Sequence, residues 1–131
     1  MVAEGGETVR RIWIGVLVLI GLLAASLGTK EYLTALHEPT AEKLHTAARE
    51  DRWENAAALS EEAAQQWSQN RHFTAALAEH EEMDRIDGLF HQLEVFRDRR
   101  DAISHGAICA QLSTAIQSLI EAHRLTWWNL L

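Results

Sequence analysis

The residues between 80 and 91 are the ones whose types and spacing could bind a metal ion. At about 100° per residue, His80, Asp84, Asp87 and His91 fall along one flank of a helix. Imidazoles and carboxylates are ligands of divalent metals. A straight helix separates His80 from His91 by about 16 Å, so one ion cannot bind both. We favour hydrogen bonds from His80 and Asp87 to a neighbouring helix, and keep metal binding as the alternative.

The same region lacks a complete catalytic template. The run from His80 to Asp84 differs by one residue from the His-Glu-x-x-His of zinc peptidases, because an aspartate stands at the fifth position. A di-iron bundle needs two Glu-x-x-His pairs, and only the one from Glu42 to His45 is present. We find no Gly-rich phosphate loop, Ser nucleophile motif or Cys–His pairing in the sequence. We therefore predict no enzyme, no catalytic residue and no cofactor.

Four tryptophans are the candidate interaction residues. Trp53 and Trp67 lie about 21 Å apart on one helix face, where core packing is favoured over a binding surface. The neighbours Trp127 and Trp128 point about 100° apart, so both cannot face one core. We expect Trp127 to pack into the bundle and Trp128 to remain exposed, suited to a protein partner or to the bilayer surface.

The spacing of apolar residues predicts four helices that carry these side chains. The first continues from the N-terminal segment through Leu33 and Leu44, with a kink or break expected at Pro39. The second begins at a capping box formed by Asp51 and Glu54, and its apolar stripe runs over residues 53–67. The second helix places Trp53 and Trp67 on one face.

The third and fourth helices follow from the same periodicity. An apolar stripe over residues 73–93 predicts the third helix, and one over residues 108–127 predicts the fourth, with Asp98 or Asp101 as its cap. The short connections between helices favour antiparallel neighbours. The predicted fold class is therefore all-α, with an N-terminal transmembrane helix followed by an up-and-down helical bundle.

The N-terminal segment is predicted to anchor the chain in a membrane. Residues 12–29 carry no charge and would span about 27 Å as a helix, close to the thickness of a bilayer core. Arg10 and Arg11 precede the segment and favour a cytoplasmic N-terminus. We therefore expect residues 1–11 in the cytoplasm, residues 12–29 in the membrane, and residues 30–131 as an extracytoplasmic bundle domain. A cleaved signal peptide is the competing interpretation.

Charge and cysteine content exclude two classes of protein. From residue 30 onward there are ten Lys plus Arg against seventeen Asp plus Glu, so the whole formal net charge of −7 lies in that part. Such an acidic surface does not suit nucleic acid. Cys109 is the single cysteine, which excludes an intramolecular disulfide scaffold. Its apolar neighbours predict a buried side chain.

Several features in order along the chain carry a family resemblance. They are Arg10-Arg11 with the apolar segment, the sequence Asp-Arg-Trp-Glu-Asn-Ala-Ala from Asp51, Trp67, the acidic run from Glu79 to Asp87, and the closing Trp-Asn-Leu-Leu. In this order they resemble the DUF4363 family, small membrane-anchored helical proteins of unknown function in Gram-positive bacteria. The resemblance implies architecture and location, and it supplies no catalytic residues.

Together these features predict a non-catalytic, membrane-anchored interaction or structural module. Its expected location is the cytoplasmic membrane of a Gram-positive bacterium, as a single-pass protein with the C-terminal domain outside. Its expected partners are membrane lipid around residues 12–29 and an unidentified protein or a second copy of the chain. The alternative is a metal-responsive sensor that uses His80 with Asp84 or Asp87.

Overall fold

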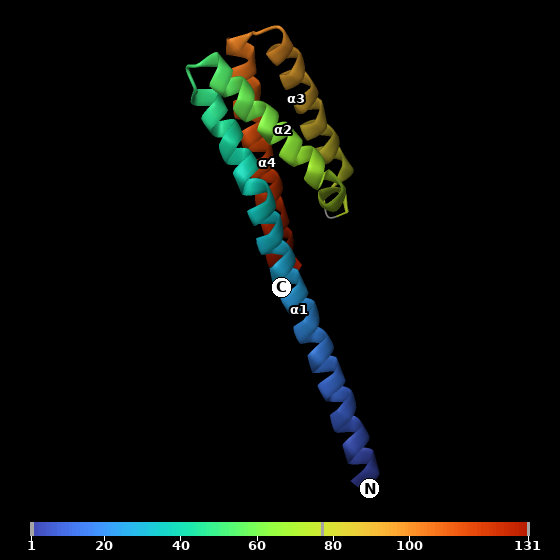
Figure 1. Cartoon of the computed structure of the whole chain (residues 1–131). Helices are drawn as coiled ribbons and strands as arrows, with labels where there is room; N and C mark the ends of the chain where they lie inside the picture. The colour runs from blue at the N-terminus through green and yellow to red at the C-terminus, as the bar shows by residue number, and fades with distance from the viewer. Residues whose placement is uncertain (1, 77, 131) are drawn as a thin grey trace. The chain divides into compact units, whose positions relative to one another are not determined.

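The chain is described here as a computed structural model, which gives the backbone of residues 2–76 and 78–130 and the side chains of residues 6–25, 28, 31–76 and 78–122. The elements are four α-helices: α1 (Val2–Arg49), α2 (Trp53–Ala75), α3 (His80–Asp98) and α4 (Ala102–Leu130) (Figure 1). No strand occurs in these described residues. The predicted all-α class is confirmed.

The chain divides into two compact units, Met1–Tyr32 and Leu33–Leu131. The first unit holds a 20-residue apolar segment, Gly6–Ala25, with a mean hydropathy of 1.9 and none of it buried. By length and composition this helical segment could cross a membrane. It overlaps the predicted anchor over residues 12–25. The side chains of residues 26, 27, 29 and 30 lie outside the described residues.

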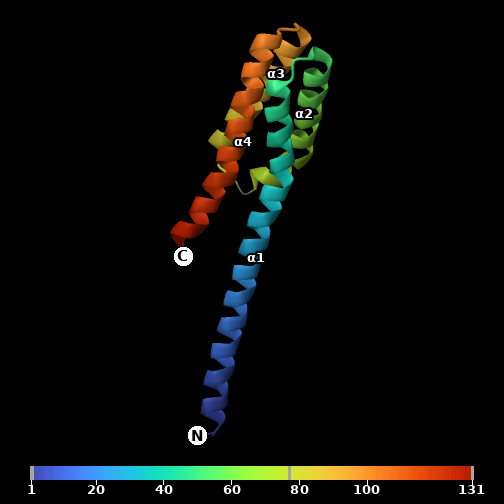
Figure 2. The ribbon, with the colours of Figure 1, turned by 90° about the vertical axis from the view of Figure 1, so that its left-hand side faces the viewer.

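The second unit is a bundle in which residues 33–49 of α1 and the helices α2, α3 and α4 alternate in direction along the chain (Figures 1 and 2). Each helix places an apolar stripe toward the others, as an amphipathic helix must in order to remove that stripe from water. The fully buried core side chains include Leu44, Ile86, Leu112 and Ile116. Burial of each stabilises the fold by about 1.5–3 kcal/mol. The predicted up-and-down bundle is confirmed.

Pro39 lies inside α1, so of the kink or break expected at this residue the break is wrong. Proline removes one backbone hydrogen bond from a helix interior. Tertiary contacts beside it hold the helix together. The Thr40 hydroxyl donates to Gln66 Oε1 at 3.1 Å, and the Ser113 hydroxyl donates to the Ala41 carbonyl at 2.9 Å. These bonds tie the residues after Pro39 to α2 and α4.

The boundary between α2 and α3 also differs from the prediction. Phe73 was expected to open the third helix, but it lies near the end of α2, and α3 begins at His80. The next residue, Thr74, is buried and donates its hydroxyl to the Asn70 carbonyl at 2.8 Å. The Ala78 N–H then donates to the Thr74 carbonyl at 2.9 Å. Burial of Thr74 therefore extends α2, whereas the 48 % exposure of Phe73 gives it no part in the core.

The start of α2 does not use the expected capping box of Asp51 and Glu54. Its N-cap residue is Arg52, which makes no side-chain capping bond. The Arg52 N–H donates instead to Glu50 Oε1 at 3.2 Å. The carboxylate that accepts a backbone hydrogen bond in this turn is therefore that of Glu50 and not that of Asp51.

The turn between α3 and α4 is defined by a left-handed residue and a cap. Arg100 has φ 54°, its N–H donates to the Arg97 carbonyl, and the Asp101 N–H donates to the Phe96 carbonyl. This pair of bonds is a Schellman motif, which usually places glycine at the left-handed position. Asp101 then caps α4 by accepting the N–H and the hydroxyl of Ser104, at 3.2 and 2.7 Å. Of the two predicted caps, Asp98 and Asp101, the structure uses Asp101.

Replacing Arg100 by glycine should stabilise the bundle. A left-handed conformation costs an L-residue about 1–2 kcal/mol, and the larger conformational freedom of unfolded glycine offsets part of that gain. We expect Arg100→Gly to raise the unfolding free energy by about 0.5–1 kcal/mol. Thermal unfolding of the full chain in detergent measures it. The control is Arg99→Gly, where φ is −83° and glycine should destabilise. Equal effects of both substitutions would contradict the expectation.

Candidate functional site

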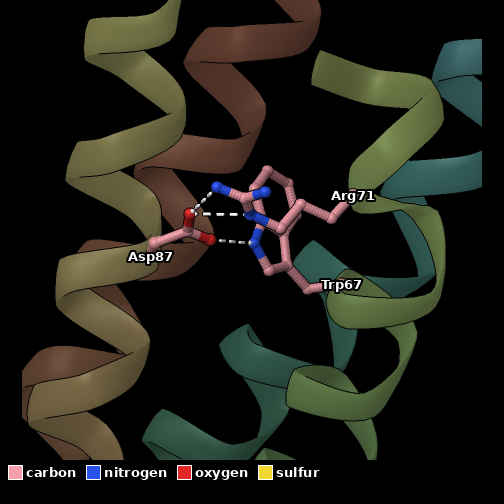
Figure 3. Close-up of polar contacts among 3 residues, drawn as sticks. All are labelled: Trp67, Arg71 and Asp87. Atoms are coloured by element: carbon pink, nitrogen blue, oxygen red, sulfur yellow. Dashed lines mark hydrogen bonds and ion pairs between the residues drawn. The ribbon is translucent and has the colours of Figure 1, made fainter. Parts of the chain in front are cut away.

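Asp87 on α3 joins two side chains of α2 (Figure 3). The Trp67 indole N–H donates to Asp87 Oδ1 at 2.8 Å. The Arg71 guanidinium donates to Oδ2 from Nε at 2.8 Å, and its Nη2 lies 2.8 Å from the same oxygen. One carboxylate therefore satisfies a core indole and pairs with a surface cation. The predicted role of Asp87, a hydrogen bond to a neighbouring helix, is present in the structure.

The electrostatics of this contact favour an ionised Asp87. Partial burial alone raises the pKa of the carboxyl group, but the hydrogen bonds from Arg71 and Trp67 outweigh it. With the added attraction of the Arg71 charge, the pKa of Asp87 is held below its ordinary value. The carboxylate is thus an acceptor and not a proton donor at neutral pH.

His37 links α1 to the end of α2 through an interior hydrogen bond. Its Nε2 lies 2.7 Å from the Thr74 hydroxyl, and both residues are 1 % exposed. Since that hydroxyl donates to the Asn70 carbonyl, it accepts from His37, which places the imidazole proton on Nε2. Burial lowers the pKa of His37 to about 4, so the ring is neutral at pH 7. Its Nδ1 then carries a lone pair, and no partner for it occurs among the described residues.

His105 makes the corresponding contact between α4 and the first half of α2. Its Nε2 lies 2.9 Å from the Ser60 hydroxyl, which donates to the Ala57 carbonyl at 2.8 Å. By the same reasoning His105 is the donor, and its Nδ1 faces the Cys109 sulfur at 3.8 Å. The Trp53 ring packs edge-on against the imidazole, with 4.9 Å between centroids. Burial, and to a smaller degree the charge of Arg97, lowers the pKa of His105.

Cys109, His105 and Ser60 have the residue types of a nucleophilic site but not its electrostatics. A reactive cysteine needs a lowered thiol pKa and an open face. Here burial raises the pKa of Cys109 to about 12, against a smaller opposing effect of the Arg97 charge. The thiol is also fully buried. The arrangement therefore acts as a hydrogen-bonded packing contact. This Cys–His pair is one that the sequence analysis missed.

Comparison with known proteins places the bundle in a family. The model of the family described as domain of unknown function DUF4363 matches residues 30–130. The chain belongs to this family. No curated protein and no solved structure matches the chain. The matched residues nearly coincide with the compact unit Leu33–Leu131, so the DUF4363 domain is the helical bundle.

The DUF4363 domain does not bring the four candidate metal ligands together. His80, Asp84 and His91 are exposed on α3, and both oxygens of Asp87 are engaged by Trp67 and Arg71. No group of three or more His, Cys, Asp or Glu side chains placed to hold a metal ion occurs among the described residues. Metal binding on this flank stays a hypothesis, and binding through Asp87 would require this side chain to give up its bonds to Trp67 and Arg71.

The candidate interaction tryptophans of the DUF4363 domain differ in their surroundings. Trp67 is 3 % exposed and belongs to the core, so its ring has no face for a partner. Trp53 is half-buried beside His105. The side chains of Trp127 and Trp128 lie outside the described residues. For Trp53 and Trp67, packing accounts for the 14-residue spacing.

The two buried histidines were not selected from the sequence. Both carry a readable signal, because each stands in an apolar stripe at helical spacing. His37 lies between Leu33 and Leu44, and His105 precedes Cys109 and Leu112 by four and seven residues. A histidine in such a stripe faces the core and must find a hydrogen-bond partner there. The partners come from α2 and cannot be identified by local spacing.

Removing the Asp87 carboxylate should separate α2 from α3. Asp87→Ala leaves the buried Trp67 N–H without its acceptor, which should cost about 1–3 kcal/mol of unfolding free energy. Asp84→Ala, one turn away and exposed, is the matched control and should change it by less than about 0.5 kcal/mol. Chemical denaturation of the full chain in detergent measures both. A similar loss in the two variants would contradict the assigned role.

Acid should destabilise the bundle through its buried histidines. His37 titrates near 6.5 when unfolded and near 4 when folded, so the unfolded state binds more protons between these values. The contribution of neutral His37 to the unfolding free energy is therefore fully present above about pH 6.5 and is lost as the pH falls toward about 4. Melting temperatures of the full chain across this range should fall less steeply in His37→Gln than in the wild type. The exposed His45→Gln is the control and should keep the wild-type slope.

Proposed function

We propose that this chain is a non-catalytic interaction or structural module, anchored in the cytoplasmic membrane by residues 12–29. The observation that carries the proposal is the exposure of every large apolar side chain in Gly6–Ala25, from Val9 to Leu23. Exposing each such side chain to water forgoes about 1.5–3 kcal/mol of transfer free energy. The segment therefore needs an apolar environment, which a bilayer provides.

The proposed orientation places the bundle on the outer face of the membrane. Arg10 and Arg11 precede the apolar core of the segment and, as positive charges beside a spanning helix, favour the cytoplasmic side. The bundle that follows carries the whole net charge of −7. The family resemblance supports a Gram-positive bacterium as the source, and hence a single membrane with the bundle outside it.

The contacts within the bundle support a non-catalytic role. Its buried polar side chains serve as bonds between helices: His37 with Thr74, His105 with Ser60, and Ser113 with Ala41. Groups used in this way fix the register of packed helices. The surface of the bundle then remains as the part that a partner protein or a second copy would contact.

Cysteine labelling in intact cells tests the anchor and its orientation together. Because Cys109 is fully buried, an introduced thiol provides the signal. Gln92→Cys, exposed on α3, should react with a membrane-impermeant maleimide in intact cells. Glu7→Cys, exposed before the apolar segment, should react only after permeabilisation.

The outcomes of this labelling separate the parts of the proposal. Reaction of both thiols only after permeabilisation would place the bundle in the cytoplasm and overturn the orientation. Recovery of the protein in the soluble fraction after alkaline carbonate extraction would overturn the anchor. The native chain without an introduced cysteine is the background control for Cys109.

A further inference from the structure

A cavity of about 430 Å³ lies within the second unit, at the end of the bundle where α2 gives way to α3. Its apolar wall includes Leu33 of α1 and Leu119 and Ile120 of α4. His37 and Thr74 border it as well. Cavities of this size hold small organic ligands, which are enclosed mainly by apolar side chains and oriented by a few polar groups.

His37, one of the residues that line this cavity, carries a ring nitrogen that lacks a hydrogen-bond partner among the described residues. The ring is 1 % exposed, and its proton lies on Nε2 toward Thr74. The buried Nδ1 is therefore a hydrogen-bond acceptor without a donor among the described residues. Leaving a buried acceptor unsatisfied is unfavourable. A ligand that fits this site must bring an O–H or N–H group.

The charges at the rim limit the ligand further. Glu79 and Glu82 border the cavity together with Arg85. The Arg85 guanidinium lies 3.9 Å from the Glu82 carboxylate, so its charge is already partly balanced. Two carboxylates against one cation disfavour a carboxylate or phosphate ligand. The carboxylates at the rim favour a ligand that is uncharged or cationic, and His37 Nδ1 favours one that carries a hydrogen-bond donor.

We propose that this cavity binds an uncharged amphiphile, whose alkyl chain packs between Leu33 and Leu119 and whose hydroxyl group donates to His37 Nδ1. The membrane is the proposed source of such molecules, because Leu33 follows the apolar segment Gly6–Ala25 by only eight residues of sequence. The choice of this source rests on the proposed function. Binding of the alcohol itself depends only on the cavity.

Photolabelling of the full chain in lipid nanodiscs tests the proposal. The probes are a ten-carbon alcohol that carries a diazirine in its chain, its methyl ether and the matching carboxylate. The alcohol should label peptides around His37 and residues 118–122 at least roughly fivefold more than the ether, which cannot donate a hydrogen bond. The carboxylate should label them least. Equal labelling by alcohol and ether would overturn the role of Nδ1.

A pair of variants on α4 locates the site. Ala122 borders the cavity, whereas Ala110 is exposed on the same helix outside its lining. Ala122→Trp should fill the space and abolish labelling at His37 by the alcohol, and Ala110→Trp should leave that labelling unchanged. Labelling that persists in Ala122→Trp, or alcohol that labels no cavity peptide, would overturn the proposal. Residues 6–25 should be labelled by all three probes, and failure there would overturn the membrane anchor instead.

Discussion

Burial of the Trp67 indole is the constraint on which the bundle depends. Its ring lies 5.3 Å from the His37 ring on α1 and 5.9 Å from the Phe90 ring on α3, measured between centroids. An indole so placed brings one N–H into the interior, where an unpaired donor is costly. Asp87 supplies the acceptor from α3. One side chain of α2 thus fixes the positions of two neighbouring helices.

Trp53, the other tryptophan of α2, packs against a histidine of α4 in a similar way. Trp53 packs on His105 as Trp67 packs on His37, so each ring rests against a histidine kept neutral by burial. In both cases the histidine donates to a hydroxyl of α2 that is itself bonded to the carbonyl of the preceding turn. The 14-residue spacing of the tryptophans therefore sets which turns of α2 meet α1 and α4.

Apolar periodicity was sufficient to predict the class and the number of helices, and residue type limited the cap of the last helix to Asp98 or Asp101, because each of these depends on local sequence. The errors at Pro39 and Phe73 have a common cause. Bonds to other helices, through Thr40 and Thr74, decide where a helix continues, and a local pattern does not contain them. The candidate site was harder for the same reason. Asp87 was selected with its neighbours on α3, but its partners come from α2.

The location of the family match bears on where a shared function resides. The matched residues 30–130 begin after the apolar segment Gly6–Ala25, so the family match covers the bundle. Most buried polar groups of the described bundle are satisfied by another helix. His37 Nδ1 has no donor among the described residues, and His37 is one of the residues that line a cavity. A buried acceptor left unsatisfied on a ring that borders a cavity is a reason to look for a ligand at that end of the bundle.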